Sequence, residues 1–274
     1  MNLAESTGAA IADKLAKLPP FGTAVLKLLN ISLDDESAVT SFEDAFKSDP
    51  VLTAELLVMA NSAAFGGRAH VQTIGMAIRF LGLEQVRSLA ATSALRSHTQ
   101  RGRRHQYLNL VWAHSVASAV AAEALGKSCG FPGLYTLGLT HDLGRLGLFL
   151  AGGEQYALEL SKEFTDIELA NQAESSLFGM THCRAGALVA TAWGFPESLA
   201  ACMGEHHRLP AGHRDPRGLM VTACQMADSL GFPEVPMCEA PGWPELHPSL
   251  EYLPQLEPET LWDEITRRIA QLGR

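Results

Sequence analysis

Histidine and aspartate residues recur along this chain in an order that suits a metal centre. His141 and Asp142 are adjacent within the apolar stretch LTHDLGRLGL, residues 139–148. Polar side chains are costly to bury without partners, so other groups must satisfy this doublet. Further imidazoles and one further carboxylate lie far from it in sequence: His114, His182, His206, His207 and Asp228. Mixed nitrogen and oxygen donors suit iron, manganese, zinc or magnesium, and a pair of such ions can activate water for attack on a phosphoester.

Each of these residues also has a purely structural interpretation. A histidine such as His114, on a helix face with alanines, is commonly a core residue whose ring bonds a backbone carbonyl. Asp228 can accept from a backbone amide, and either His206 or His207 can face solvent, because adjacent residues on a helix point about 100° apart. The order histidine, histidine-aspartate, histidine, histidine pair, aspartate is more specific than any single member and favours a gathered cluster.

The segments that carry these residues are predicted to be helices. Apolar residues recur every three or four positions in almost every segment, which predicts an all-α protein. We expect a long central helix over 107–127, which carries His114. Further helices are expected over 154–163, 166–178, 182–193, 196–207 and 218–230. Adjacent side chains diverge on a helix, so His141 and Asp142 can converge on one point only at a helix end or a kink.

A set of shorter helices is expected in the first hundred residues, over 11–18, 21–32, 42–47, 50–59, 73–82 and 83–95. Asp49-Pro50 predicts an N-cap followed by a proline in the first helical position. Ser41 is expected to cap the helix that begins at Phe42. Asn61 and Ser62 are interpreted as polar residues that cap a helix end before a turn at 65–67.

The chain is expected to divide into three regions. Residues 1–100 form an N-terminal helical lobe, residues 105–232 form the helical lobe with the histidines and aspartates, and residues 233–274 are a proline-rich segment followed by an amphipathic helix. The basic run over 101–105 is interpreted as a solvated linker between the lobes. The final helix, over 259–272, is expected to pack back on the domain rather than to bind a partner.

Composition excludes several function classes. The 274 residues are 47% hydrophobic and 19% charged, as in a globular protein, and the formal net charge of −9 disfavours nucleic-acid binding. Five scattered cysteines form no Cys-x-x-Cys pair, which argues against a disulfide framework or a zinc ribbon. The sequence has no charged start before an apolar signal core and no uninterrupted apolar run of 18 residues, so we expect a cytoplasmic protein without a membrane partner.

The chain resembles the HDOD (HD-related output) domain family of the HD superfamily over roughly residues 14–230. The stretches that carry the resemblance are LPPFGTAVLKLL, SDPVLTAELLVMANSAAFG, IGMAIRFLGLEQVRSLA, HDLGRLGLF and HCRAGALVATAWGFPESLAACMGEHH. The resemblance implies an all-α, two-lobed helical domain, an HD-like helical bundle preceded by an N-terminal helical lobe. Members of the family are mostly regarded as bacterial signalling or regulatory modules, often without demonstrated catalysis.

Another branch of the superfamily, the HD-GYP cyclic-di-GMP phosphodiesterases, suggests one or two divalent ions, iron, manganese, zinc or magnesium. By that resemblance the metal ligands would be His114, His141, Asp142, His182, His206, His207 and Asp228. Three features depart from those enzymes. Leu110 stands one turn before His114, where some of them have a carboxylate, Arg145 replaces a lysine, and the Gly-Tyr-Pro element is absent from RLPAGHRDPRG after His207.

The arginine bears directly on catalysis. A guanidinium stays protonated near neutrality and is a poor proton donor to a leaving oxygen. Arg145 can instead clamp a phosphate through its fork of donors, or form an ion pair with an acid such as Asp142 or Glu174. Asp142 and Arg145 are therefore the only catalytic candidates, and neither is assigned.

Two functions follow as hypotheses. The leading one is a bacterial signal-transduction module that regulates a protein partner without efficient catalysis. The alternative is a metal-dependent phosphohydrolase acting on a phosphate-containing small molecule such as a nucleotide or cyclic dinucleotide.

Overall fold

The computed structural model describes residues 3–62, 71–101, 106–131, 133–207, 215–239, 242–243 and 256–272. All regular structure in these ranges is helical, and the sole extended pairing among them is an isolated bridge between Phe164 and Met237. The prediction of an all-α protein is therefore confirmed. The expected linker over 101–105 begins with Arg101, which is the last residue of a helix, and its remaining residues 102–105 lie outside the described ones. The turn at 65–67, the segment 208–214 and most of the proline-rich stretch also lie outside the described residues.

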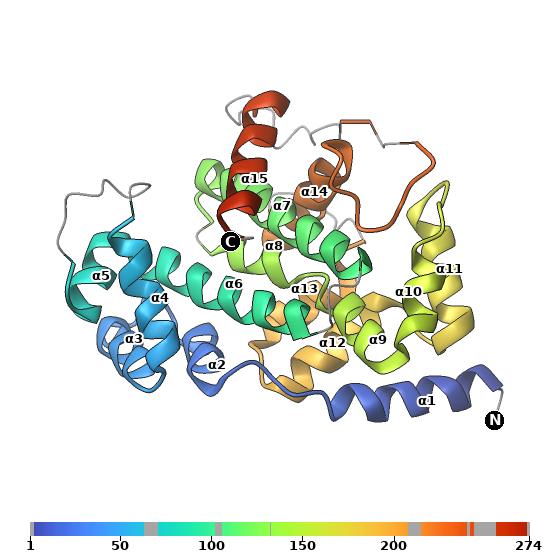
Figure 1. Cartoon of the computed structure of the whole chain (residues 1–274), viewed down its shortest axis with the longest axis horizontal. Coiled ribbons are helices and arrows are strands. Elements are labelled where there is room, and N and C mark those ends of the chain that lie inside the picture. Colours follow the sequence, from blue (N-terminus) through green and yellow to red (C-terminus); the bar gives the residue numbers. More distant parts are fainter. Residues whose placement is uncertain are drawn as a thin grey trace.

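The N-terminal helices are α1 (Leu3–Ala16), α2 (Thr23–Asn30), α3 (Ala38–Lys47), α4 (Pro50–Ala60), α5 (Ile74–Leu81) and α6 (Leu83–Arg101). Helices α2–α5 group at one end of the molecule, and the long helix α6 runs from them toward the other end (Figure 1). Helix α1 is separate from that group. It packs against α9 (Leu143–Gly152), α11 (Ile167–Phe178) and α12 (His182–Trp193) instead.

Local capping determines where these helices begin. Oδ1 of Asp49 accepts from the amides of Val51 and Leu52, at 3.1 and 3.0 Å, so the predicted N-cap of α4 is confirmed. The predicted cap at Ser41 is wrong, because α3 begins at Ala38 and its N-cap is Ser37. The Ser41 amide already donates to the Ser37 carbonyl at 2.9 Å, which places Ser41 inside the first turn.

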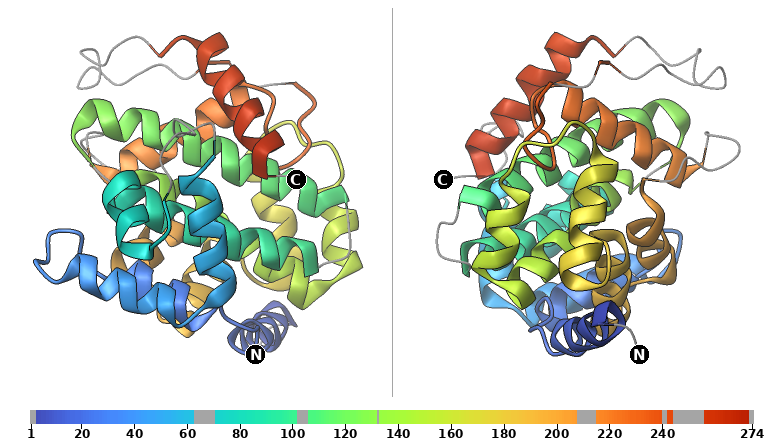
Figure 2. Two further views of the ribbon diagram at one scale, coloured as in Figure 1. Left: turned by 60° about the vertical axis from the view of Figure 1, so that its left-hand side comes forward. Right: turned by 90° about the vertical axis from the view of Figure 1, so that its right-hand side faces the viewer.

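The remaining helices form the larger part of the molecule. They are α7 (Gln106–Cys129), α8 (Leu134–Thr140), α9, α10 (Glu154–Leu160), α11, α12, α13 (Glu197–Glu205), α14 (Pro216–Ser229) and α15 (Pro258–Leu272). Helix α7 is central, with α8, α14 and α15 packed around it (Figure 2). Among the described helices α7 alone is long and apolar enough to cross a membrane by length and composition, and 67% of that apolar window is buried inside the protein. Its central position accounts for its apolar character.

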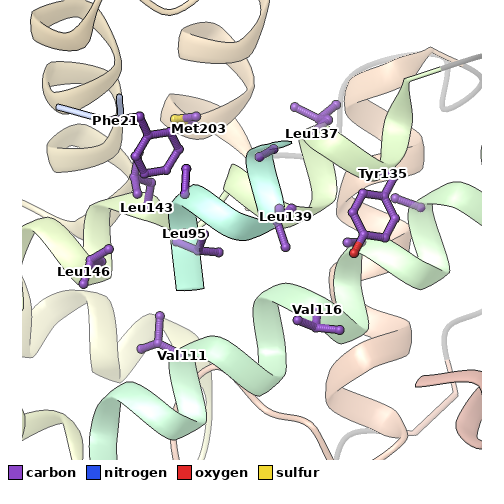
Figure 3. Close-up of a cluster of buried hydrophobic side chains, with 14 of the residues drawn as sticks. Phe21, Leu95, Val111, Val116, Tyr135, Leu137, Leu139, Leu143, Leu146 and Met203 are labelled. Carbon is purple, nitrogen blue, oxygen red and sulfur yellow. The ribbon is translucent and has the colours of Figure 1, made fainter. Parts of the chain in front are cut away.

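A single apolar core joins the two groups of helices. Phe21 and Leu95 from the N-terminal part lie with Val111, Leu143 and Met203 from the larger part in one buried cluster (Figure 3). Burial of apolar surface on this scale is the main driving force for folding.

Small residues bring α7 and α8 into close contact. A Cβ atom on Gly138 would lie 2.7 Å from the Cα of Ala119 and 2.7 Å from the Ser118 carbonyl oxygen, so only glycine fits there. This close approach places His114 on α7 beside the end of α8, where His141 lies.

The C-terminal helix α15 covers α7. Leu261 and Ile265 are buried, Arg268 lies over the ring of Tyr135, and its Nη2 is 3.8 Å from Oε2 of Glu123 on α7. The prediction that this helix packs back on the domain is confirmed.

Candidate metal centre

The His141-Asp142 doublet lies at the junction of two helices. Helix α8 ends at Thr140, His141 is its C-cap, and Asp142 is the N-cap residue of α9. The two side chains therefore lie at a helix end, where adjacent residues can converge on one point. Gly144, in the first turn of α9, allows that helix to rest on α12, because a Cβ atom there would lie 1.9 Å from the His182 carbonyl oxygen. The contact brings Asp142 next to His182.

Four histidine rings are oriented in the same way. His141 and His206 are both C-cap residues, and each donates from Nδ1 to the carbonyl three residues earlier, Gly138 at 2.6 Å and Met203 at 2.9 Å. Nδ1 of His114 donates to the Phe232 carbonyl at 2.8 Å. The fourth ring, His182, donates from Nδ1 to Oε2 of Glu174 at 2.8 Å. A neutral imidazole that donates from Nδ1 carries its lone pair on Nε2.

These lone pairs converge. Nε2 of His114 lies 3.2 Å from Nε2 of His141, and Nε2 of His182 lies 3.2 Å from that of His206. A fifth ring, that of His207, places its own Nε2 2.9 Å from Nε2 of His182. Two neutral rings that both present Nε2 as an acceptor cannot hydrogen-bond to each other. A metal cation between the nitrogens satisfies both lone pairs, and an outer Nδ1–H bonded to a carbonyl or carboxylate is the usual support of a ligating histidine.

Burial keeps these rings neutral. Desolvation lowers the pKa of His114 to about 4, and it lowers the pKa values of His141 and His206 well below the ordinary value. The pKa of His182 is also lowered, first by burial and then by the charge of Arg145. Neutral imidazole is the form that binds metals, so the cluster is ready to bind a cation at neutral pH.

The carboxylate of Asp142 fits the same interpretation. It is fully buried, and neither of its oxygens has a hydrogen-bond partner. Oδ1 lies 3.6 Å from Nε2 of His182 and 3.9 Å from Nε2 of His206. Burial raises the pKa of Asp142 well above its usual value. A carboxyl oxygen such as Oδ1, placed beside inward-facing imidazole lone pairs, belongs to a donor set that suits a divalent cation.

Arg145 occupies the opposite side of that carboxylate. Its side chain is fully buried, with Nε 3.0 Å from Oδ2 of Asp142, Nη1 3.0 Å from Oε1 of Glu174 and Nη2 2.6 Å from Oε2 of Glu234. Burial opposes the charge of Arg145, but the three carboxylates outweigh it and raise its pKa well above the usual value. The ion-pair interpretation of Arg145 is confirmed, with Glu234 as an additional partner.

Glu234 is the main site residue that sequence reasoning missed. It lies beyond α14, in a segment held in place by the pairing of Phe164 with residues 236 and 238. Its Oε2 lies 3.4 Å from Nε2 of His207, and His207 and Arg145 overcome the effect of burial to hold its pKa well below the usual range. A glutamate in a proline-rich stretch shows no periodicity that would indicate burial.

Asp228 is at the edge of the cluster. Its Oδ1 lies 3.4 Å from Nδ1 of His114, on the side of the ring away from the converging Nε2 atoms, and accepts from the Glu234 amide at 3.3 Å. The structural alternative of a carboxylate bonded to a backbone amide is thus present. On the Nε2 side of the His114 ring, Cys224 places its Sγ 3.6 Å from Nε2.

All seven predicted ligand positions therefore lie in one region, with Asp228 at its margin. Among the described residues, four sets of donor atoms lie close enough together to hold an ion, each within 4.8 Å: His182, Cys183, His206 and His207; His114, His141 and Cys224; Asp142, His182, His206 and Glu234; Cys224, Asp228 and Glu234. Neither cysteine was predicted as a ligand.

A surface cleft leads to this region. It has a volume of about 930 Å³ and lies between α11, α12 and α13. Cys183 and His207 contribute to its wall, together with Arg184 and Glu205. Small molecules or ions can therefore reach one end of the buried cluster from solvent.

Comparison with known families now decides the relationship. The family model of the HDOD domain matches residues 18–209. The chain belongs to the HDOD domain family. The resemblance expected from the motifs is thereby confirmed, and the matched region includes the doublet and both histidines of the 206–207 pair.

Solved structures share the HDOD fold. An HDOD domain protein of unknown function from Geobacter sulfurreducens is 23% identical, with a TM-score of 0.73 over 98% of this chain and 96% of that chain. A candidate phosphohydrolase from Shewanella amazonensis is 22% identical, with a TM-score of 0.64 over 97% and 96% of the two chains. A candidate signal transduction protein from Marinobacter aquaeolei is 19% identical, with a TM-score of 0.71 over 99% of this chain and 66% of that chain. These likenesses establish the fold.

One curated relative matches as well, an uncharacterized protein from Treponema pallidum. It is 23% identical over 219 residues, which are 78% of this chain and 42% of the relative. The chain thus spans less than half the length of that relative.

Proposed function

We propose that this HDOD protein is a metal-binding signal-transduction module that regulates a protein partner and has no efficient hydrolytic activity. The observation that carries the proposal is the convergence of five imidazole Nε2 atoms in a buried cluster whose one cationic side chain, Arg145, is already bound by carboxylates. The cluster supplies ligands for an ion, and its arginine is a poor proton donor.

The state of Arg145 argues against efficient turnover. Hydrolysis of a phosphoester needs a group that protonates the leaving oxygen or neutralises its charge. The guanidinium of Arg145 has a raised pKa and donates to Glu174 and Glu234, so it is a poor acid and has little donor capacity left for a phosphate. An ion held beside it is better suited to a structural or sensory role than to catalysis.

The N-terminal helices offer a surface for a protein partner. Val51 and Val58 on α4 are 70% and 72% exposed, and Met76 and Phe80 on the adjacent α5 are 41% and 45% exposed. Exposed apolar side chains on neighbouring helices support a docking role. A regulator of this kind acts in the cytoplasm, where signalling partners are available.

The test combines metal analysis with a turnover assay. Purified protein is loaded separately with iron, manganese and zinc, analysed for metal content, and assayed on cyclic dinucleotides and nucleotides. We expect stoichiometric metal that is lost in His182→Ala, and no turnover above the Asp142→Ala background. Robust hydrolysis that is abolished by Asp142→Ala would contradict the regulatory proposal. Folded wild-type protein that takes up no metal would contradict the metal-binding part of it.

The second candidate is a metal-dependent phosphohydrolase. The observation that favours it is the cleft of about 930 Å³, which reaches the cluster at His207 and carries the cation Arg184 on its wall. Under this candidate a phosphate-containing substrate binds in the cleft, and Arg184→Ala raises KM in the same assay. If turnover is absent, or if it is unaffected by Arg184→Ala and Asp142→Ala, the candidate is rejected.

A further inference from the structure

Cys183 lies where a fourth ligand would complete the imidazole group at the mouth of the cleft. Its Sγ is 3.5 Å from Nε2 of His182 and 4.0 Å from Nε2 of His206. The donor atoms of His182, Cys183, His206 and His207 all lie within 4.8 Å of one another. Four donors at mutual distances of this size surround a volume that suits one small cation.

The distances can be compared with those of a tetrahedral zinc site. Zn–N bonds of about 2.05 Å and a Zn–S bond of about 2.3 Å place neighbouring nitrogens about 3.3 Å apart and sulfur about 3.6 Å from each nitrogen. From Nε2 of His182, the separations are 3.2 Å to His206, 2.9 Å to His207 and 3.5 Å to Sγ of Cys183. The observed separations differ from the tetrahedral values by less than half an ångström.

A second observation points independently to a cation at this position. Asp142 is fully buried, both of its oxygens lack hydrogen-bond partners, and Oδ1 faces His182 and His206 at 3.6 and 3.9 Å. A carboxyl oxygen placed against imidazole lone pairs is unfavourable unless a proton or a metal cation lies between them. The nearest donors of that charge in the chain, those of Arg145, lie on the other oxygen, Oδ2.

Arg145 competes with a metal ion for the nearby carboxylates, and this competition indicates which residue is the fourth ligand. The carboxylates of Asp142 and Glu234 both lie against the Arg145 guanidinium, Glu234 at 2.6 Å, which reduces their capacity to bind a metal ion. The hydrogen-bond contacts of Cys183 are instead with the imidazole nitrogens of His182 and His206. Sulfur is therefore the donor with the least competition from the protein's own charge.

We propose that His182, Cys183, His206 and His207 form a closed three-nitrogen, one-sulfur zinc site. This inference rests on the metal binding proposed above and names the class of ion and an additional ligand. A thiolate favours zinc over magnesium and manganese. Four protein ligands also leave no position for a reactive water, which is the arrangement of a structural site and agrees with a regulatory role.

Cobalt(II) provides the test, because it replaces zinc and absorbs light according to its ligands. Metal-free wild-type protein is titrated with Co²⁺, and then with Zn²⁺ in competition. We expect intense visible bands of tetrahedral cobalt and a near-ultraviolet sulfur-to-cobalt charge-transfer band. In Cys183→Ser the charge-transfer band is lost and zinc affinity falls at least tenfold.

The matched control uses another cysteine. Cys202 is buried on α13 outside the cluster. Cys202→Ser is expected to retain the band. Zinc-edge X-ray absorption of wild-type protein, which needs no variant, is expected to show one sulfur neighbour at about 2.3 Å.

The failures are distinguishable. Wild-type protein that binds cobalt or zinc with nitrogen and oxygen ligands alone, or a charge-transfer band that persists in Cys183→Ser, overturns this inference and leaves the proposed metal binding intact. Folded wild-type protein that binds neither ion overturns both.

Discussion

Glu234 accepts hydrogen bonds from two nitrogens of Arg145, Nε at 3.2 Å and Nη2 at 2.6 Å, although 89 residues separate them in the chain. With Asp142 and Glu174 also against this guanidinium, one positive side chain meets three carboxylates. The excess of negative charge lies next to the imidazole cluster and favours a bound cation there.

Removal of the Arg145 charge is expected to destabilise the protein strongly. Arg145→Met leaves three buried acids uncompensated, which corresponds to a loss of about 3–5 kcal/mol in the free energy of unfolding. Urea denaturation of metal-free protein measures it. The control is Arg217→Met, because the pair of Arg217 with Glu205 is exposed and is worth about 0–1 kcal/mol. Equal losses in the two variants would contradict the structural role of the buried network.

Zinc is expected to stabilise the native protein. An ion that binds only the folded state at a hundred times its dissociation constant adds about 2.7 kcal/mol to the free energy of unfolding, and a chelator removes it. Thermal denaturation with and without zinc shows the shift, and His182→Ala abolishes it. His98→Ala is the matched control, because His98 is a buried histidine bonded to the carbonyls of Ala94 and Pro19 outside the cluster. A lost zinc response in His98→Ala would mean that loss of stability alone explains the effect.

The contact between α9 and α12 is expected to admit no side chain at Gly144. The Cβ atom of Gly144→Ala would lie 1.9 Å from the His182 carbonyl oxygen, so the helices must separate and the ligands on them move apart. We expect a loss of more than about 3 kcal/mol together with weaker metal binding, measured by denaturation and zinc titration. Gly204→Ala serves as the control, since its Cβ meets only the Cβ of Ala187 at 3.5 Å. Near-normal zinc affinity in Gly144→Ala would refute the positioning role of this contact.

Acid is expected to destabilise the metal-free protein between pH 6.5 and about 4. Burial lowers the pKa of His114 to about 4, and it lowers the pKa values of His141, His182 and His206. The unfolded chain therefore binds protons in this window that the native protein does not, and stability falls as the pH falls. Asp142 and Asp228, whose pKa values burial raises, act in the opposite direction.

The four histidines with lowered pKa values outnumber the two carboxylates with raised pKa values. The free energy of unfolding is therefore expected to fall on the order of 1–3 kcal/mol per unit of decreasing pH. Urea denaturation in chelator at pH 7, 6 and 5 measures the slope, and His114→Gln is expected to make it shallower. A slope that is flat or of opposite sign would show that the carboxylates dominate.

The fold and much of the site could be predicted because the signals are local. The doublet at a helix end follows from the divergence of adjacent side chains, and Asp49-Pro50 is a complete capping signal within two residues. Ser41 was misassigned because two serines compete for one helix start, and the Asp35 side chain, which bonds the amide and hydroxyl of Ser37, decides between them. For Asp228, sequence spacing could not decide between a metal ligand and an acceptor from a backbone amide.

Residues whose burial depends on distant contacts could not be predicted. Glu234 is carried into the site by the pairing of Phe164 with the segment after α14, and nothing in the neighbouring sequence indicates that pairing. Cys183 follows a predicted ligand directly, so helical geometry suggests that it points elsewhere. Its approach to His206 depends on where α13 ends, which is a property of the tertiary structure.

The C-cap histidines connect an ion to the backbone. Helix ends leave carbonyls without partners, and the Nδ1–H groups of His141 and His206 satisfy one carbonyl each at the ends of α8 and α13. Each of these rings therefore serves a helix end through Nδ1 and leaves Nε2 available to a ligand. A substitution at either position removes a helix cap together with a candidate metal ligand, so the stability of that helix end and the affinity for an ion are expected to fall together.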